Sequence, residues 1–489
     1  MMTKMIGKKI NMMTTTIDAP KTYTAKTALF PFQRDSVERA KGFNGRCLLA
    51  LEQGLGKTLV AITYIMETKA FPAVIVCPAS LKYNWSREFE KHYGKKVTVL
   101  SGTKAHINKL STDPNAVYVL NYDIVHAWTE LLLAIKPKIL VLDESQMIKT
   151  PSARRTKSCA KLAMATENFL ALSGTPMSNS PMDIYTTLNM ILKGKMISRW
   201  QFMNRYTRYY QSRFGLKITG TKNEQELNGY LNSRCMIRYR ADDVLPDLPP
   251  YIRQTLLIEM TREQRAEYNK LREAFIHWLR EKYPDRKIKP SDTAEIVTKF
   301  GYMKRQVAEW KIPTVNDNIN YFLENNDGKL LVFGLHRKVL DGIYGAFSKY
   351  NKPGSPFIVR IDGQTPPDER MKAVDAIQEG GARVFLGQMI AAGVGLTLTA
   401  SHHSLFSELD FLPMNHLQAE ARNRRIGTDA SFVHYNYLVM KDTIEELVAD
   451  TLFRRQQSVD QIIDNIQNPD SFNLIGRIIE EHFHFNFSD

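Results

Sequence analysis

The sequence has few cysteines and no long hydrophobic run. Four cysteines occur in 489 residues, too few for a disulfide scaffold, and none have the spacing of zinc ligands, so we expect a reducing compartment. No apolar stretch approaches the roughly 18 residues that a membrane-spanning helix needs, and we expect no membrane contact. Residues 1–16 lack the apolar centre of a signal peptide, which predicts a cytoplasmic protein.

The charge is mostly of one sign. Lysine and arginine total 66 against 51 aspartates and glutamates, which gives a formal net charge of +15. Such a balance suits a polyanionic partner, most commonly nucleic acid, although many basic proteins bind none. The basic segment 261–311 has 13 basic and 8 acidic side chains, and an amphipathic helical insertion explains it better than a dedicated binding surface.

A glycine-rich turn lies between an apolar stretch at 47–51 and a helix-like stretch at 59–66. The turn consists of Gly54-Leu55-Gly56-Lys57-Thr58. In a strand–turn–helix context such backbone amides bind nucleotide phosphates, the lysine reaches the β- and γ-phosphates, and the threonine hydroxyl is offered to Mg²⁺. The strict pattern has glycine where this chain has Leu51, so a plain turn beside a lysine is the alternative. We predict that these five residues bind ATP, with Mg²⁺ on Thr58.

Short, continuous apolar runs alternate with helical patterns in two blocks, as expected for α/β lobes with buried parallel sheets flanked by helices. The runs lie at 74–76, 117–120, 139–142 and 169–172, and then at 330–333, 357–359, 384–386 and 433–435. The sequence predicts a basic, disordered tail (1–26), a first lobe (27–190), a helical insertion and linker (191–325), a second lobe (326–450) and a C-terminal helical extension (451–489).

Two carboxylates follow the apolar run 139–142. Because polar residues at the ends of parallel strands face the ligand edge of a sheet, Asp143 and Glu144 are placed to act on the nucleotide. We predict that Asp143 holds Mg²⁺ and that Glu144 orients the attacking water. An Asp-Glu pair after a strand is usually a plain turn, but here it follows the phosphate-binding pattern.

Three further patterns follow in order. They are Leu172-Ser173-Gly174-Thr175-Pro176 with Asn179 beyond, the glycine turn Ala392-Gly393-Val394-Gly395-Leu396-Thr397, and the basic run from Gln418 to Gly427. Within the last, Arg422 and Arg425 are three residues apart, so on a helix they would share a face. Two arginines aimed at a nucleotide would stabilise the charge of the transition state.

The order of these motifs resembles that of superfamily 2 helicase-like ATPases, and within them the Swi/Snf-type DNA translocases, over roughly residues 27–450. The resemblance implies two RecA-like lobes, with nucleotide contacts from Gln33, which would read adenine, and Gly395. It implies a catalytic role for Gln418 beside Lys57, Glu144, Arg422 and Arg425. It also implies coupling through Gln146, Ser173 and Thr175, and DNA contacts from Ser80, Asn84, Trp85 and Thr397.

Finer features resemble the annealing-helicase branch, notably 361–363 with Arg370, and 406–409. The chain departs from the family at Gln146, where histidine is usual, and at Ala421 and Arg424, which replace an aspartate and a histidine. These departures put the fine coupling between the lobes in doubt. We find no chromodomain, bromodomain, zinc finger or separate substrate-recognition domain.

The sequence thus predicts a monomeric DNA-dependent ATPase that remodels duplex or branched DNA by fork remodelling, strand annealing or branch migration. The alternatives are a motor that reshapes a protein bound to DNA, and a scaffold that binds nucleotide and DNA without hydrolysis. The intact Lys57, Glu144 and Arg425 argue against the scaffold. We expect a bacterial or viral origin, or a nuclear protein if the source is eukaryotic.

Overall fold

The computed structural model describes residues 24–111, 113–177, 180–212, 215–284, 293–393, 396–425, 427–446 and 448–449. These residues form two compact units, and the chain crosses between them at 207/208, at 220/221 and, for the last time among the described residues, between Pro246 and Asp247. The first unit holds residues 24–207 and 221–246, and the second holds 208–220 and 247–449. Most of the predicted N-terminal tail and the whole predicted C-terminal extension lie outside the described residues.

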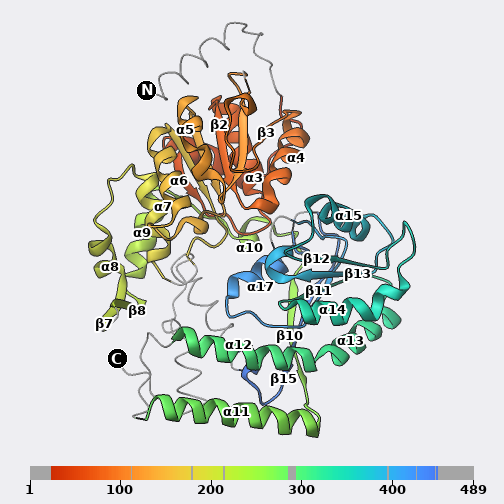
Figure 1. The fold of residues 1–489 in the computed structure, drawn as a ribbon. Helices are drawn as coiled ribbons and strands as arrows, with labels where there is room; N and C mark the ends of the chain where they lie inside the picture. Colours follow the sequence, from red (N-terminus) through yellow and green to blue (C-terminus); the bar gives the residue numbers. More distant parts are fainter. Residues whose placement is uncertain are drawn as a thin grey trace. The chain divides into compact units, whose positions relative to one another are not determined.

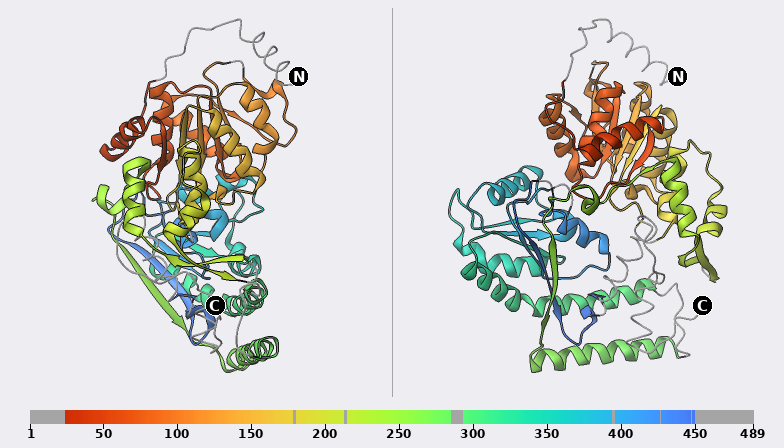
Figure 2. Two further views of the ribbon diagram at one scale, coloured as in Figure 1. Left: turned by 90° about the vertical axis from the view of Figure 1, so that its left-hand side faces the viewer. Right: turned by 180° about the vertical axis from the view of Figure 1, so that it is seen from behind.

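The first unit is built on a seven-stranded sheet with the order β3-β4-β2-β5-β6-β1-β9, in which all pairs are parallel. Its strands are β1 (Arg46–Leu49), β2 (Ala73–Cys77), β3 (Thr98–Val99), β4 (Val117–Asn121), β5 (Ile139–Asp143), β6 (Asn168–Leu172) and β9 (Met236–Ile237). Helices lie on both sides of this sheet (Figures 1 and 2). Because β1, β2, β4 and β5 are buried along their whole length, the apolar runs in the sequence predicted them without any alternation.

The helices of the first unit fall into two packed groups. The helices α2, α3 and α4 contact one another in order, and so do α5, α6, α7 and α8. Their bounds are α2 (Pro31–Gly42), α3 (Lys57–Thr68), α4 (Lys82–Tyr93), α5 (Val125–Ala134), α6 (Arg154–Ala165), α7 (Met182–Ile191), α8 (Arg199–Tyr206), α9 (Glu224–Arg234) and α10 (Ala241–Val244), with the short 3₁₀ helices η1 (Ala79–Leu81), η2 (Ile107–Lys109) and η3 (Ser145–Ile148).

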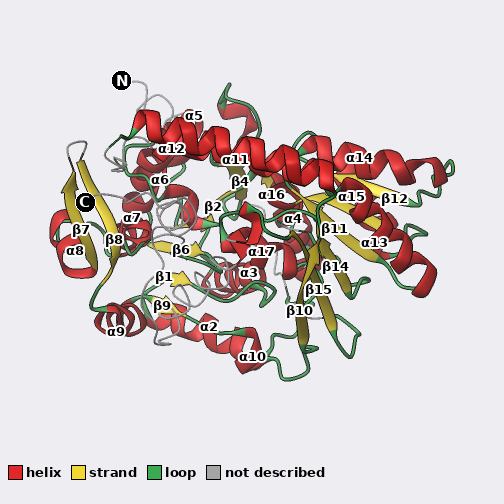
Figure 3. Ribbon diagram, turned by 90° about the horizontal axis from the view of Figure 1, so that it is seen from below, coloured by secondary structure: helices red, strands yellow, loops and turns green. Residues whose placement is uncertain are grey.

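The second unit is built on a six-stranded parallel sheet with the order β10-β15-β14-β11-β13-β12, whose strands lie side by side in Figure 3. The strands are β10 (Tyr251–Ile258), β11 (Leu330–Gly334), β12 (Ile358–Ile361), β13 (Val384–Gln388), β14 (His403–Phe406) and β15 (Val433–Met440). The helices are α11 (Arg262–Lys282), α12 (Thr293–Trp310), α13 (Ile312–Asn325), α14 (Arg337–Phe347), η5 (Ser348–Tyr350), α15 (Pro367–Gln378), α16 (Met389–Ala392) and α17 (Pro413–Glu420).

Successive residues of the second sheet feed two separate cores. Leu331 and Phe333 of β11 pack in the core that includes α11, α12, α16 and α17, while Leu330 and Val332 pack with α13 and α14. This alternation is what a strand covered by helices on both faces requires. The predicted fold class, two lobes with parallel sheets flanked by helices, is therefore confirmed.

The segment 191–325, predicted to be a helical insertion, contains strands as well. β9 pairs with β1 in the first sheet, and β10 pairs along its whole length with β15 in the second. The strands β7 (Thr207–Ser212) and β8 (Gly215–Thr221) form a small sheet of their own. The segment thus completes both lobes instead of forming one helical unit. Within the described residues, no helix has the length and apolarity that a membrane crossing requires.

A buried arginine joins three elements of the first unit. Arg46, the first residue of β1, donates hydrogen bonds of 2.6 to 3.2 Å to backbone carbonyls near the ends of α6 and α7, namely Ala163, Thr166, Glu167, Met190 and Ile191. Burial lowers the pKa of Arg46 to about 10, so the side chain stays charged at neutral pH.

Arg46→Leu is therefore expected to lower the free energy of unfolding of the first unit by about 3 kcal/mol, because buried carbonyls would lose their donor. Urea denaturation followed by tryptophan fluorescence would measure the change. Lys161→Met removes a cation that is 64% exposed and is the matched control, with an expected effect within about 0.5 kcal/mol. Equal stability of the two variants would contradict the role assigned to Arg46.

Candidate active site

The predicted phosphate loop connects β1 to the N-terminus of α3. Gly54 and Gly56 both have positive φ, 86° and 77°, which favours glycine. A Cβ atom on Gly56 would lie 2.5 Å from Nε2 of Gln33, so a larger residue would have to displace that side chain. The N-cap residue of α3 is Gly56, which has no side chain to cap the helix, and a helix start of this kind suits an anion.

Gln33 of α2 is buried beneath this loop. Its Oε1 accepts a hydrogen bond from the amide of Phe30 at 3.1 Å, and its Nε2 donates to the carbonyl of Leu55 at 3.1 Å. The residue predicted to read adenine is thus tied to the phosphate loop. A side-chain amide has two donor hydrogens and two acceptor sites, so both atoms keep capacity for one more partner.

Lys57 and Thr58 open α3 and are half-buried. The ammonium of Lys57 donates to the carbonyls of Leu51 at 3.0 Å and Glu52 at 3.2 Å. In the same loop, Nε2 of buried Gln53 has no hydrogen-bond partner among the described residues, and the side-chain amide lies against Gly174. Sequence reasoning did not assign Gln53 a role, because a polar residue before a glycine turn carries no pattern of its own.

Asp143 ends β5 and is buried. Trp85 Nε1 donates to Asp143 Oδ2 at 2.9 Å, and the amide of Glu144 donates to Oδ1 at 3.0 Å. The hydroxyl of Tyr122 donates to the Asp143 carbonyl at 2.8 Å. Burial, and next the charge of Glu144, raise the pKa of Asp143 to about 7, against the opposing effects of Trp85 and Lys57.

Glu144 follows with a left-handed backbone, φ 52° and ψ 54°, which is uncommon for a residue with a side chain. Its Oε2 accepts a hydrogen bond from Gln146 Nε2 at 2.6 Å, and Gln146 Oε1 accepts from the hydroxyl of Ser173 at 2.8 Å. The amide of Thr175 donates to Ser173 Oγ at 3.2 Å. The three residues predicted for coupling therefore form one chain of hydrogen bonds that ends on Glu144. Asn179 lies outside the described residues.

The residues predicted to contact DNA differ in exposure. Ser80 and Thr397 are exposed and Asn84 is half-buried, whereas Trp85 is fully buried. Since the indole of Trp85 packs inside the first unit and donates to Asp143, this structure does not present it to DNA. Trp85 instead holds the acidic residue in place.

The predicted arginines lie beyond the end of a helix. The helix α17 ends at Glu420, so Arg422 and Arg425 sit in turns and do not share a helical face as expected. Their guanidinium groups nevertheless meet, because Nη1 of each donates to the carbonyl of Leu396 at 3.0 Å. Arg425 Nη1 also donates to Thr397 Oγ1 at 2.9 Å. The turn thus brings the two groups together without a helix.

Gln418, on α17, is buried, and its carbonyl accepts a hydrogen bond from Arg422 Nε at 2.7 Å. This bond ties the first predicted arginine to the last turns of the helix. Gly395 lies outside the described residues.

The residues of the first unit fit a nucleotide with Mg²⁺. The glycine cradle, the uncapped α3 and the unpartnered buried amide of Gln53 leave donors for phosphate oxygens. The Thr58 hydroxyl and the Asp143 carboxylate are hard oxygen donors of the kind that Mg²⁺ prefers.

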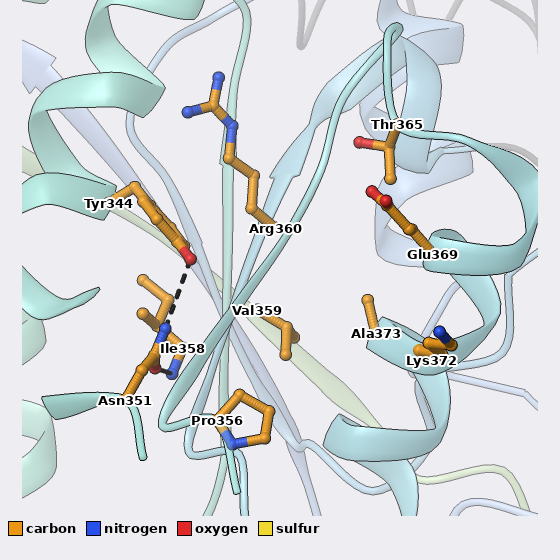
Figure 4. A pocket seen from close by; sticks show the side chains of 10 residues that line it. All are labelled: Tyr344, Asn351, Pro356, Ile358, Val359, Arg360, Thr365, Glu369, Lys372 and Ala373. Atoms are coloured by element: carbon orange, nitrogen blue, oxygen red, sulfur yellow. Dashed lines mark hydrogen bonds between the residues drawn. The ribbon is translucent and has the colours of Figure 1, made fainter. Parts of the chain in front are cut away.

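A pocket elsewhere does not belong to this site. It has a volume of ≈ 440 Å³ and lies beside the edge strand β12 of the second unit, where Asn351 Nδ2 donates to the hydroxyl of Tyr344 (Figure 4). Arg360 lines it, but the guanidinium group pairs with Asp341 at 2.6 Å and Asp362 at 2.9 Å. Lys372 and Glu369 also line the pocket, so its lining carries charges of both signs.

Comparison with known families decides the classification. Residues 36–309, more than half of the chain, match the SNF2-related domain, and residues 310–427 match the helicase conserved C-terminal domain. The chain belongs to the SNF2-related, helicase-like ATPases. The resemblance drawn from the sequence motifs is thereby confirmed.

Similar proteins come from animals. The DNA annealing helicase and endonuclease ZRANB3 of Bos taurus is 31% identical over 447 residues, 88% of this chain and 40% of the relative. The SWI/SNF-related matrix-associated actin-dependent regulator of chromatin subfamily A-like protein 1 homolog of Caenorhabditis elegans is 31% identical over 465 residues, 94% of this chain and 64% of the relative. The chain thus spans less than two thirds of the length of these relatives.

These animal relatives overturn the expectation of a cytoplasmic protein of bacterial or viral origin. Among solved structures, the Sulfolobus solfataricus SWI2/SNF2 ATPase core in complex with dsDNA aligns with 97% of this chain and 100% of that chain. It does so at 21% identity and a TM-score of 0.42, a score too low to carry an argument.

Proposed function

We propose that this SNF2-related chain hydrolyses ATP to move along duplex or branched DNA and remodels it by fork remodelling, strand annealing or branch migration. The observation that carries the proposal is the hydrogen-bond chain from Thr175 through Ser173 and Gln146 to Glu144, beside the phosphate loop. It joins the carboxylate of Glu144, which would act on the attacking water, to the loop that holds Ser173 and Thr175. A motor needs such a connection to couple hydrolysis to movement. Relatives named as DNA annealing helicases support the DNA transaction.

Each predicted site residue then has a role in hydrolysis. Lys57 and the first amides of α3 bind the β- and γ-phosphates, while Gln33 contacts adenine with its remaining hydrogen-bond capacity. Thr58 and Asp143 would hold Mg²⁺, which would neutralise phosphate charge. Glu144, oriented by Gln146, accepts the proton of the attacking water.

The arginine-bearing turn of the second unit would supply the two arginines that the sequence predicts to be catalytic. Arg422 and Arg425 donate to the charge that develops on the transferred phosphoryl group, and Gln418 supports Arg422. The exposed Ser80 and Thr397, with Asn84, contact the DNA backbone, so binding is independent of base sequence. No observation favours a protein bound to DNA as the substrate.

The test is steady-state ATP hydrolysis without nucleic acid and with single-stranded DNA, blunt duplex, forked DNA or RNA. We expect strong stimulation by duplex or fork and little by RNA. Because the protein is proposed to contact mainly the phosphates of DNA, its affinity for DNA is expected to fall about a thousandfold between ~50 and ~200 mM salt. Hydrolysis indifferent to all five conditions, or DNA affinity insensitive to salt, would refute the proposal.

A further inference from the structure

After the last described crossing of the chain into the second unit, a short segment contacts the arginine-bearing turn. The boundary between the units follows Pro246, and β10 begins at Tyr251 as an edge strand paired with β15. We call residues 249–253 the entry segment and residues 421–425 the arginine turn. Within the second unit, two sets of contacts join them.

The first set is a partly buried ion pair at the end of α17. Arg253 of the entry segment donates from Nε to Glu420 Oε1 at 2.7 Å and from Nη2 to Oε2 at 2.6 Å. The hydroxyl of Tyr437 donates to Glu420 Oε1 at 2.6 Å. Burial alone would lower the pKa of Arg253, but the hydrogen bond and charge of Glu420 raise it well above its usual value. Such a bidentate pair fixes both position and orientation.

The second set comes from Arg424 inside the arginine turn. Its Nε donates to the carbonyl of Pro249 at 2.8 Å, and its guanidinium carbon lies 4.8 Å from the centre of the Tyr251 ring. The guanidinium carbon of Arg253 lies 4.7 Å from the same ring centre. Tyr251 therefore contacts two cations, one from each segment, in cation–π geometry.

These contacts flank a proposed catalytic arginine. Glu420 and Arg424 bracket Arg422, and Arg425 follows at once. In addition, Tyr435 on β15 donates to the Glu420 carbonyl at 3.0 Å, so the start of the turn is held from two strands. Arg424 is also one of the two positions in this run where the chain departs from the family's usual residues. Here the unusual residue has a defined task, since an arginine reaches both a carbonyl and a ring.

We propose that Arg424 and the Arg253–Glu420 pair are positioning residues, which tie the entry segment to the arginine turn so that a pull on the segment moves Arg422 and Arg425. This proposal rests on the proposed function in one respect, which is that Arg422 and Arg425 take part in hydrolysis. The tie itself is a property of the second unit. The entry segment begins three residues after Pro246, the last described residue of the first unit, so a change at that crossing of the chain would reach the arginines through these contacts.

The experiment uses the full chain and two readouts. Arg424→Met removes the hydrogen bond and the cation while keeping the stem, and Arg424→Lys keeps the cation. Hydrogen exchange should rise at residues 421–425 in Arg424→Met and stay near wild type in the rest of the second unit. The DNA-stimulated kcat should fall between about tenfold and a hundredfold with an unchanged KM for ATP. Arg424→Lys should recover part of both effects.

Arg280→Met, at an exposed position on α11, is the matched control and should change neither readout. Unchanged exchange in the turn would refute the tie. A wild-type kcat in Arg424→Met, or exchange raised evenly through the second unit, would refute the positioning role. A failure of the proposed function would look different, because the wild-type chain itself would then show no hydrolysis stimulated by DNA, while exchange would still decide whether the tie exists.

Discussion

Lys57→Ala is expected to lower kcat for ATP hydrolysis by about a thousandfold and to weaken nucleotide binding. The ammonium group of Lys57 rests on the carbonyls of Leu51 and Glu52, where it stands at the start of the phosphate loop. Alanine would leave the glycine cradle and the uncapped helix intact but would remove the only charge that the loop itself brings to the phosphates. Loss of a single donor to developing charge typically costs about a hundredfold to a thousandfold, and here a full charge is lost.

Steady-state hydrolysis with saturating duplex DNA would measure this loss, and a fluorescent nucleotide would measure binding. Lys157→Ala makes the same change at an exposed site on α6 of the same unit and should leave both values unchanged. If Lys57→Ala hydrolysed ATP as fast as the control, the phosphate loop would not be the catalytic nucleotide site.

The sequence predicted strands best where both faces of a strand are buried. Runs such as those of β5 and β11 are apolar throughout, because helices cover each side. β14 shows no such run, since it begins with His403 and Ser404. The ring of His403 stacks on that of His434 at 5.0 Å, and Ser404 receives a hydrogen bond from Asn423. Only partners distant in sequence make those polar residues suitable for a strand.

The edge strand β10 was missed for a different reason. Most of its residues are exposed, so its pattern resembles that of a surface segment as much as that of a strand. Its pairing along eight residues with β15 comes from a partner about 180 residues away, which no local pattern reveals. For the same reason, no local pattern indicates that Arg253 pairs with Glu420.

The candidate site was predictable where chemistry is local. Three features of the site depend only on neighbouring residues and could be predicted from the sequence. They are the glycines with positive φ, the lysine at the start of a helix and the carboxylates at the end of a strand. Trp85 shows the limit of predicting a residue's role from a motif. The resemblance implied that Trp85 contacts DNA, whereas the structure buries the side chain. Its spacing of four from Leu81 and Phe89 is that of a buried helical face, and this signal agrees with the structure.

Glu144→Gln is expected to bind ATP with nearly unchanged affinity and to lower kcat between about a hundredfold and ten thousandfold. The substitution keeps the shape of the side chain but removes the carboxylate that would take the proton of water. It also replaces an acceptor of the Gln146 Nε2 hydrogen bond with an amide, whose oxygen can still accept. The hydrogen-bond chain through Ser173 to Thr175 should therefore survive, and the loss would fall on turnover alone.

Two comparisons separate a base from a structural carboxylate. Glu130→Gln makes the same change on a side chain that is 68% exposed and should hydrolyse ATP at the wild-type rate. Gln146→Leu removes the hydrogen bond to Glu144 but leaves the charge of Glu144 in place. This variant should lower kcat less than Glu144→Gln does, because the base remains and loses only its orientation. The family usually has a histidine at position 146, whose side chain titrates, whereas a glutamine side chain does not. The hydrogen bonds of Gln146 to Glu144 and Ser173 should therefore not depend on pH through residue 146. Normal turnover in Glu144→Gln would mean that another group accepts the proton of the attacking water. Glu144 would then be only a hydrogen-bond partner of Gln146.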